Sequence, residues 1–206
     1  RIGDIAPDFT AMTTTGPLTF SEYNKGSWVI FFSHPADFTP VCTTEMCGFA
    51  QEQESFFTKN NCKLMGLSID SIHSHIAWVD NVRRNTGILY EFPIVADIDM
   101  SVSKLWGMLQ PGESETAAVR AVFIIDPNGK VRLLMYYPLN IGRNMDEIKR
   151  ALVALQTSDE NKVACPLDWR PGDKVIVPAP KTIAALAERK ASNLEMVDWY
   201  LAKKSL

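Results

Sequence analysis

The chain has 206 residues, of which 46% are hydrophobic and 22% are charged, and its formal net charge is −3 at pH 7. This composition is typical of a globular protein with a real core, and the length suits one domain with a smaller appended part. A mildly acidic surface does not attract phosphate backbones or anionic headgroups, so we expect neither nucleic acid nor a membrane as partner. The four cysteines are too few for disulfides to hold the fold together. They also lack Cys-x2-Cys spacing, so no zinc site is expected.

Apolar runs alternate with amphipathic segments along most of the chain. Residues 27–33 (SWVIFFS) are almost continuously apolar, which is typical of a strand buried on both faces. Two later apolar runs flank the sequence DPNGK at 126–130, a strong hairpin signal. The order of elements predicts an α/β domain with a mixed sheet over residues 1–165. We expect strands at 27–33, 63–69, 92–95, 118–125 and 131–137, and helices at 41–57, 73–84, 102–109 and 145–155.

The composition changes after Cys165. The stretch CPLDWRPGDKVIVPAP is rich in proline and turn residues, and a short helical pattern at 182–190 and an aromatic tail follow it. A segment of this size is too small to bury a core of its own. We therefore expect residues 166–206 to form a C-terminal arm that packs on the main domain or on a second subunit.

The chemistry of the sequence concentrates around Cys42, in the segment HPADFTPVCTTE at 34–45. Thr39 is a good N-cap and Pro40 suits the first helical position, so Cys42 falls in the first turn of a helix. Unpaired backbone N–H groups and the positive end of the helix dipole favour a negative sulfur there, and the thiolate is the form that reacts with peroxide. The alternative is that Cys42 is simply a small buried hydrophobic residue.

Arg120 interrupts the apolar run AVRAVFII at 118–125. An arginine in a buried strand needs an anionic partner, and a cysteine thiolate would serve. The alternative is an edge or outward position, where the guanidinium would be solvated.

Together these residues resemble the signature of the peroxiredoxins. Pro35, Thr39 and Cys42 form the pattern PxxxTxxC, and the longer string SHPADFTPVCTTE is similar to the one-cysteine, peroxiredoxin-6-like class. The likeness continues in order through GLSIDS, HIAW, FPIVAD, the Arg120 strand, YYPLNIGRN and DW to the C-terminal arm. It implies a thioredoxin-like fold and a hydroperoxide reductase that uses no metal or organic cofactor.

The resemblance also implies roles for individual residues. Cys42 would be the peroxidatic cysteine, which attacks the peroxide and becomes a sulfenic acid. Thr39 would hydrogen-bond the sulfur and the peroxide, Pro35 would shield the pocket, and Arg120 would hold the thiolate and the transition state. The residues expected to brace this group are Glu45 and Arg143.

The three histidines are less informative. His34 could tune Cys42 or bind the sulfenate, or it could make a structural hydrogen bond at the end of its strand. We assign His73 and His75 to a solvated helix face and ordinary packing.

The step that returns Cys42 to the thiol has several candidates. Cys47 gives the Cys-x4-Cys spacing of another peroxiredoxin class, the bacterioferritin-comigratory proteins, but an intact helix separates such residues by about 140° and about 7.5 Å along its axis. Cys165, at the start of the arm, could reach Cys42 only after arm movement or across a dimer, and Cys62 is expected to be inert. The leading hypothesis is therefore an external thiol reductant such as thioredoxin or glutathione.

Three other activities are less well supported. Ser27 lacks the flanking glycines of a Gly-x-Ser-x-Gly lipase element, and a general thiol–disulfide oxidoreductase would need a Cys-x-x-Cys motif. A holdase chaperone remains an alternative that would not depend on Cys42. Beyond the hydroperoxide substrate and the thiol, we expect a homodimer formed through the C-terminal arm, or a ring of such dimers, located in the cytoplasm.

Overall fold

The computed structural model describes residues 1–206 and divides into two compact units, Arg1–Met145 and Asp146–Leu206. The division falls after the first residue of helix α5 (Met145–Asn161), about one helix earlier than the boundary predicted at 165/166. Val153 and Ala154 of this helix pack against the small apolar cluster of the second unit, which accounts for the earlier division.

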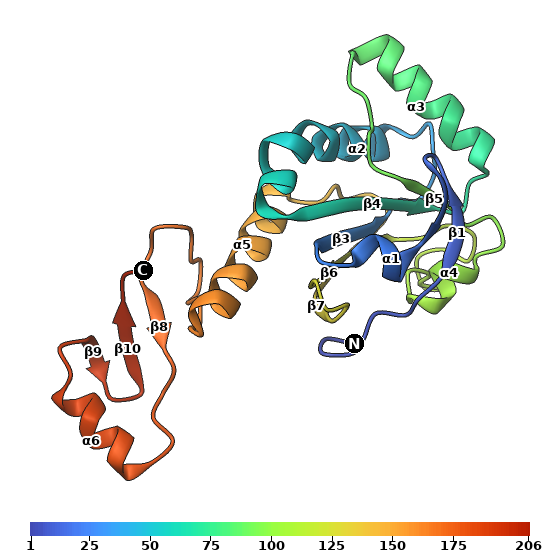
Figure 1. Ribbon diagram of the computed structural model, residues 1–206. Coiled ribbons are helices and arrows are strands. Elements are labelled where there is room, and N and C mark those ends of the chain that lie inside the picture. The colour runs from blue at the N-terminus through green and yellow to red at the C-terminus, as the bar shows by residue number, and fades with distance from the viewer. The chain divides into compact units, whose positions relative to one another are not determined.

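A seven-stranded mixed sheet forms the centre of the first unit (Figure 1). Its order is β2-β1-β5-β4-β3-β6-β7, and the central strand β3 (Trp28–Ser33) pairs parallel with β4 (Cys62–Ser68) and antiparallel with β6 (Arg120–Ile125). The mixed α/β architecture expected from the sequence is therefore confirmed. The remaining elements of this unit are β1 (Thr10–Thr13), β2 (Gly16–Thr19), β5 (Ile94–Ala96), β7 (Val131–Tyr137), α1 (Phe20–Asn24), α2 (Pro40–Glu52), α3 (Ile72–Thr86) and α4 (Ser101–Leu105).

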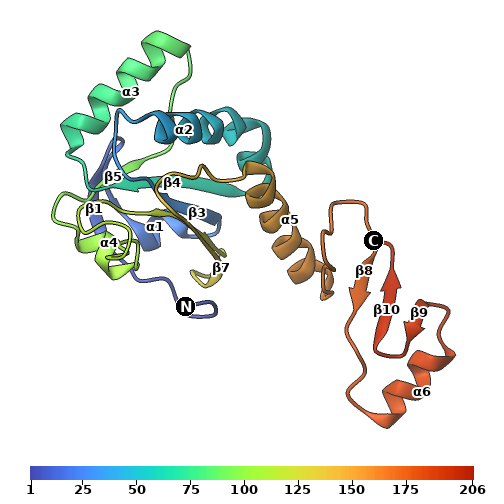
Figure 2. The ribbon, with the colours of Figure 1, turned by 180° about the vertical axis from the view of Figure 1, so that it is seen from behind.

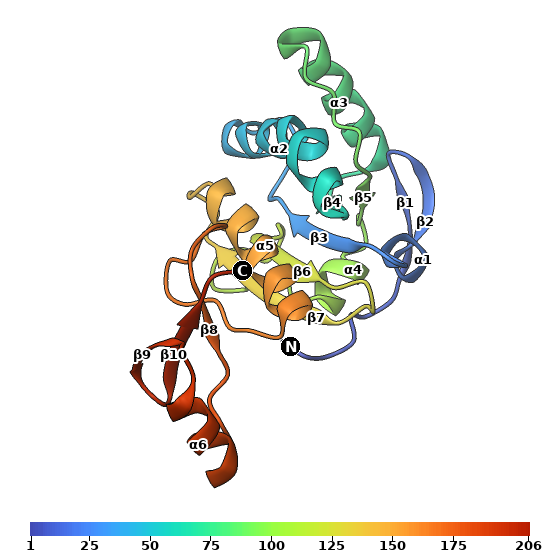
Figure 3. The ribbon, with the colours of Figure 1, turned by 60° about the vertical axis from the view of Figure 1, so that its left-hand side comes forward.

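Helices cover both faces of this sheet, with α2 and α3 on one face and α4 on the other (Figures 2 and 3). Successive residues of β3 supply the two cores, because side chains alternate along a strand. Phe31 packs against Trp106 on the α4 face, with ring centroids 4.8 Å apart. Phe32 stacks on Phe49 of α2, with centroids 4.0 Å apart. This two-sided burial explains the continuous apolar run of the strand.

Two features of the first unit were not expected. Residues 10–19 form the β1–β2 hairpin, whose turn uses Gly16 at a φ of 110°. The predicted helix 41–57 begins at Pro40 and changes after Glu52 into a π-helical turn, Gln53–Phe57.

The second unit contains a three-stranded antiparallel sheet, in the order β8-β10-β9. Its strands and helix are β8 (Val175–Val177), α6 (Ile183–Ala191), β9 (Glu195–Asp198) and β10 (Leu201–Lys204). Val163, Trp169 and Val175 form a small buried cluster to which Val153, Ala154 and Cys165 also contribute, so residues 166–206 alone do not supply this cluster. None of the protein's helices combines the length and apolarity required to cross a bilayer.

Candidate active site

Cys42 lies in the first turn of α2, immediately after the loop that follows β3. Thr39 is the N-cap residue in extended conformation and Pro40 opens the helix, as predicted. The Thr39 side chain does not cap, however, because its hydroxyl donates to the carbonyl of Ala36 at 2.7 Å. Cys42 itself is fully buried. Pro35 is partly buried in the same loop.

Arg120, the first residue of β6, points inward and is only 3% exposed. Its Nη1 donates to Cys42 Sγ at 3.3 Å and to Glu45 Oε2 at 2.7 Å. Its Nε and Nη2 both donate to the carbonyl of Leu139, at 2.9 and 2.6 Å. Of the two positions that the sequence left open for Arg120, the structure therefore shows the inward one.

Glu45 stands three residues after Cys42 on α2 and joins two arginines. Arg143 donates to its carboxylate from Nε, from Nη2 and from the backbone N–H, at 2.9, 2.7 and 2.8 Å. Burial alone would raise the pKa of Glu45, but the charge and hydrogen bonds of Arg143, with the charge of Arg120, hold it below its usual value. The carboxyl group is therefore ionised at neutral pH.

Arg143 is held on several sides. Its Nη1 donates to the carbonyls of Ser33 and Ala121, at 2.8 and 3.0 Å. Its guanidinium also lies over the rings of Phe32 and Phe49, 5.2 and 5.4 Å from their centroids. This arginine therefore links β3, β6 and α2 around the site.

The charges of the group favour a negative sulfur. Two buried guanidiniums face one buried carboxylate, so one positive charge has no counterpart among these three side chains. An unbalanced buried charge is unfavourable, and a thiolate at Cys42 would balance it. The site can therefore hold a reactive anionic sulfur with donors beside it.

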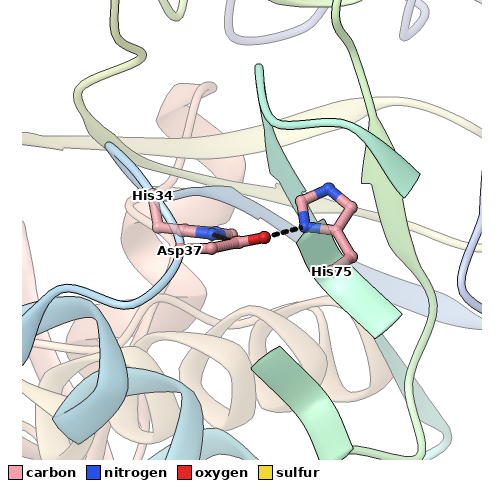
Figure 4. Close-up of side chains that lie close together, drawn as sticks. All are labelled: His34, Asp37 and His75. Atoms are coloured by element: carbon pink, nitrogen blue, oxygen red, sulfur yellow. Dashed lines mark hydrogen bonds and ion pairs between the residues drawn. The ribbon is translucent and has the colours of Figure 1, made fainter. Parts of the chain in front are cut away.

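A second buried group, which no sequence pattern indicated, joins the same loop to α3 (Figure 4). Asp37 Oδ1 is 2.9 Å from His34 Nε2, and Asp37 Oδ2 is 2.7 Å from His75 Nδ1. The ordinary packing expected of His75 is therefore only part of its role, because this buried ring also hydrogen-bonds Asp37. His75 precedes the buried Trp78 and Val82 by three and seven residues, and this helical spacing could have revealed its position. The exposed His73 does lie on the solvated face.

The ligand atoms of His34, Asp37 and His75 lie within 4.8 Å of one another, which is close enough to suggest a metal ion. Two ligands of a tetrahedral zinc, each at about 2.0–2.1 Å from the metal, would stand about 3.3 Å apart. The observed N···O separations of 2.9 and 2.7 Å are hydrogen-bond lengths. The group is therefore better described as a hydrogen-bonded network.

The other cysteines all occur as free thiols. Cys47 Sγ lies 3.5 Å from the hydroxyl of Tyr90, and Cys165 Sγ donates to the carbonyl of Ala154 at 3.5 Å. Burial raises the pKa of the Cys62 thiol, which suits an inert residue. No contact within the first unit places Cys47 beside Cys42.

Comparison with known proteins gives a consistent result. Residues 2–134 match the AhpC/TSA family, and residues 154–191 match the C-terminal domain of 1-Cys peroxiredoxin. Peroxiredoxin 2 of Caldanaerobacter subterraneus is 52% identical to the chain, over 100% of the chain and 93% of the relative. A peroxiredoxin of Methanosarcina mazei is 50% identical, over 98% and 96%.

Solved structures agree with these sequence matches. The yeast mitochondrial 1-Cys peroxiredoxin, studied for thiol resolution via glutathione/thioredoxin systems, has a TM-score of 0.88 and 37% identity, covering 100% of this chain and 99% of its own. A cysteine-to-serine variant of peroxiredoxin 6 from Arenicola marina also has a TM-score of 0.88, with 35% identity and coverage of 100% and 97%. The thioredoxin-like fold expected from the sequence is thereby confirmed.

Proposed function

Because the chain belongs to the AhpC/TSA family and is a 1-Cys peroxiredoxin, a thiol-dependent hydroperoxide reductase, we propose that Cys42 is its peroxidatic residue. The observation that carries this proposal is the hydrogen bond from Arg120 Nη1 to Cys42 Sγ, at 3.3 Å within a buried group. That donor, the first-turn position and the unbalanced positive charge all favour a thiolate at this sulfur.

The reaction forms one S–O bond and breaks the O–O bond of the hydroperoxide. The Cys42 thiolate attacks the terminal oxygen in line, and the leaving oxygen takes up a proton and departs as water or an alcohol. Arg120 stabilises the charge that moves from the sulfur to the leaving oxygen. Cys42 is left as sulfenic acid.

Thr39 and Pro35 complete the substrate side of the site. The Thr39 hydroxyl proton is committed to the Ala36 carbonyl, so its oxygen is left to accept a hydrogen bond. A hydroperoxide O–H would donate to it, which orients the substrate for attack. Pro35 excludes water from the loop, and Glu45 and Arg143 brace Arg120.

We propose that an external thiol, such as thioredoxin or glutathione, reduces the sulfenic acid. Cys47 lies one and a half helical turns beyond Cys42 on α2, and its sulfur faces Tyr90. Cys165 belongs to the second unit. The yeast 1-Cys peroxiredoxin named above is resolved through glutathione and thioredoxin systems, which supports the same arrangement here.

We also propose a homodimer formed through the C-terminal arm, residues 166–206, with a ring of dimers as a further assembly. Large apolar side chains of this arm are strongly exposed in the single chain, such as Leu167 and Ile183. The cytoplasm is the proposed location, since four free thiols suit a reducing compartment.

The test is peroxide titration of the reduced protein followed by intact-mass measurement. Wild-type protein should gain one oxygen at Cys42 and lose it on addition of a thiol, and Cys42→Ser should consume no peroxide. Cys62→Ser is the matched control, because it removes a buried thiol outside the site, and it should react like wild type. Peroxide consumption by Cys42→Ser would exclude the proposed nucleophile.

A further inference from the structure

The buried network of His34, Asp37 and His75 takes no part in the mechanism proposed above. His34 follows β3, Asp37 lies in the loop that leads to Cys42, and His75 lies on α3 (Figure 4). The side chains of both histidines are 0% exposed and that of Asp37 is 1% exposed. None of their polar atoms is exposed to bulk solvent, so the hydrogen bonds that the protein makes to them decide which ring nitrogens carry a hydrogen.

The Asp37 carboxylate contacts both histidines. Burial alone would raise the pKa of Asp37, but hydrogen bonds from His34 and His75 hold it well below its usual value. Asp37 is therefore ionised and can only accept, so His34 Nε2 and His75 Nδ1 must both carry a hydrogen.

The two histidines differ at their second ring nitrogen. His75 Nε2 lies 3.1 Å from the carbonyl of Val95, which is also an acceptor, so His75 satisfies both contacts only as an imidazolium. His34 Nδ1 is buried without any partner, and burial lowers the pKa of His34. His34 therefore carries a single hydrogen.

This assignment makes the network electrically neutral, with one cation, one anion and one neutral ring. A second proton on His34 would give a net buried positive charge, and a neutral His75 would give a net negative one, both unfavourable. The charge of Arg143 also disfavours a second proton on His34. Tyr90, which also faces Asp37, stays a neutral phenol because burial raises its pKa.

We propose that His75 is a positioning residue of the peroxidase: its imidazolium holds the Asp37 carboxylate, which keeps His34 in the singly protonated form and anchors the loop 34–39 at the start of α2. The inference rests on the proposed function of Cys42. The same loop is held from β4, because the Asp37 backbone N–H donates to Asp70 Oδ2 at 3.0 Å. Asp70 is in turn held by Ser68 Oγ, at 2.6 Å. Asp37 thus joins α3 and β4 to the loop that carries Thr39.

Removal of the His75 imidazolium should leave His34 to neutralise the Asp37 carboxylate. In His75→Gln the Asp37 carboxylate remains, and His34 becomes the nearest group able to neutralise it by taking a second proton. The rate of Cys42 oxidation should therefore acquire a new inflection in its pH profile from the titration of His34, which a merely structural role would not produce. The rate at pH 7 should fall about tenfold to a hundredfold, as displaced catalytic groups commonly cause.

The direct test is nitrogen NMR of the reduced full-length protein with labelled histidines. The chain has three histidines, so the ring signals can be assigned by substitution. In wild-type protein at pH 7, His75 should carry hydrogens on both ring nitrogens and His34 only on Nε2. In His75→Gln, His34 should gain a second hydrogen. The matched control is His73→Gln, an exposed position on the same helix, which should change neither the spectra of the other two rings nor the pH profile.

Asp37→Asn is the second variant, and it tests the proposed protonation of His75 if His75→Gln does not fold. Without the anion, His75 should lose its second hydrogen at pH 7. A singly protonated His75 in wild-type protein, an unchanged His75 in Asp37→Asn, or a wild-type pH profile in His75→Gln would each overturn the inference. Failure of the proposed function is distinguishable, because it would appear as peroxide consumption by Cys42→Ser and would leave the NMR result unaffected.

Discussion

Arg120 illustrates how one side chain can hold both a structural and a reactive contact. Two of its nitrogens share the Leu139 carbonyl, and the third, Nη1, meets both Glu45 and the sulfur of Cys42. The planar guanidinium fixes these donors in one rigid arrangement. A lysine would keep the charge but could not make the same set of contacts.

Arg120→Lys should therefore slow the reaction with peroxide although the charge is retained. Loss of one oriented donor to a transition state commonly reduces the rate by about 10²–10³-fold, and we expect an effect of this size. The measurement is the second-order rate constant of Cys42 oxidation by stopped flow. Arg84→Lys on the exposed face of α3 is the control, and it should match wild type. A rate for Arg120→Lys within threefold of wild type would contradict the role assigned to the guanidinium.

Glu45→Gln should destabilise the protein, because it leaves two buried arginines without their shared anion. Removing one partner of a buried pair commonly costs about 3–5 kcal/mol, so the free energy of unfolding at pH 7 should fall by about this amount. The pKa of Glu45 lies below the ordinary 4.5. The stabilisation of the folded state by ionised Glu45 is therefore complete above pH 4.5 and is lost as the pH falls through the lowered pKa.

The pH dependence gives this prediction an internal check. Urea unfolding at pH 7 and at lower pH should show a smaller loss of stability on acidification for Glu45→Gln than for wild type. Asp37 has a lowered pKa in both proteins and contributes acid sensitivity of the same sign to each. Equal slopes of stability against pH in the two proteins would contradict the ion-pair description.

At the scale of elements, the predictable parts were those with a strong local pattern. The run SWVIFFS predicted β3 correctly because both faces of that strand are buried. The hairpin at DPNGK joins β6 and β7 as expected. The β1–β2 hairpin was missed because its strands have four residues each and are rich in threonine, without a clear apolar alternation.

The proposed catalytic group was predictable in part for a related reason. The position of Cys42 follows from local signals, Thr39 and Pro40, and Arg120 is conspicuous because it interrupts an apolar run. The His34–Asp37–His75 network joins residues 38 positions apart, and no local pattern indicates that pairing. The Thr39 hydroxyl likewise donates to the Ala36 carbonyl and does not cap the helix, which no local pattern indicated.

Helix α2 also determines what Cys47 can do. It runs unbroken from Pro40 to Glu52, so residues five apart are separated by about 140° around the helix and about 7.5 Å along it, beyond disulfide reach. Cys47→Ser should therefore keep peroxide turnover with an external thiol within about threefold of wild type, because the proposed reaction does not use the Cys47 thiol and the substitution is small. Steady-state consumption with a thiol reductant measures this.

Mass measurement separates the alternatives for the return step. Oxidised wild-type protein should show added oxygen, whereas a loss of two hydrogens would indicate a disulfide. Cys165→Ser is the companion variant, because Cys165 is the other candidate partner of Cys42. A disulfide that disappears in Cys47→Ser but persists in Cys165→Ser would show that the first turns of α2 unwind during the cycle.

At the scale of the whole molecule, the residues proposed for peroxide reduction all belong to the first unit. Cys42, Thr39, Arg120, Glu45 and Arg143 lie within Arg1–Met145. The second unit carries the most exposed of the large apolar side chains: Leu167 is 91%, Ile183 87% and Val197 75% exposed. These side chains are the candidates for the surface that the proposed dimer would cover. In this proposal the two units have separate tasks, chemistry for the first and association for the second.

Ile183→Glu should weaken the proposed dimer and leave the first chemical step intact. A charge placed on an apolar contact of an interface must be desolvated, and a loss of 1.4 kcal/mol already weakens association about tenfold. Sedimentation velocity across a concentration series should show monomer at concentrations where wild type is dimeric.

Ile98→Glu is the matched control, an isoleucine 68% exposed in the first unit, and it should leave the association unchanged. The rate of Cys42 oxidation should stay within about threefold of wild type in both variants, because each chain holds its own complete set of these residues. A dimer that survives Ile183→Glu but dissociates in Ile98→Glu would place the interface on the first unit.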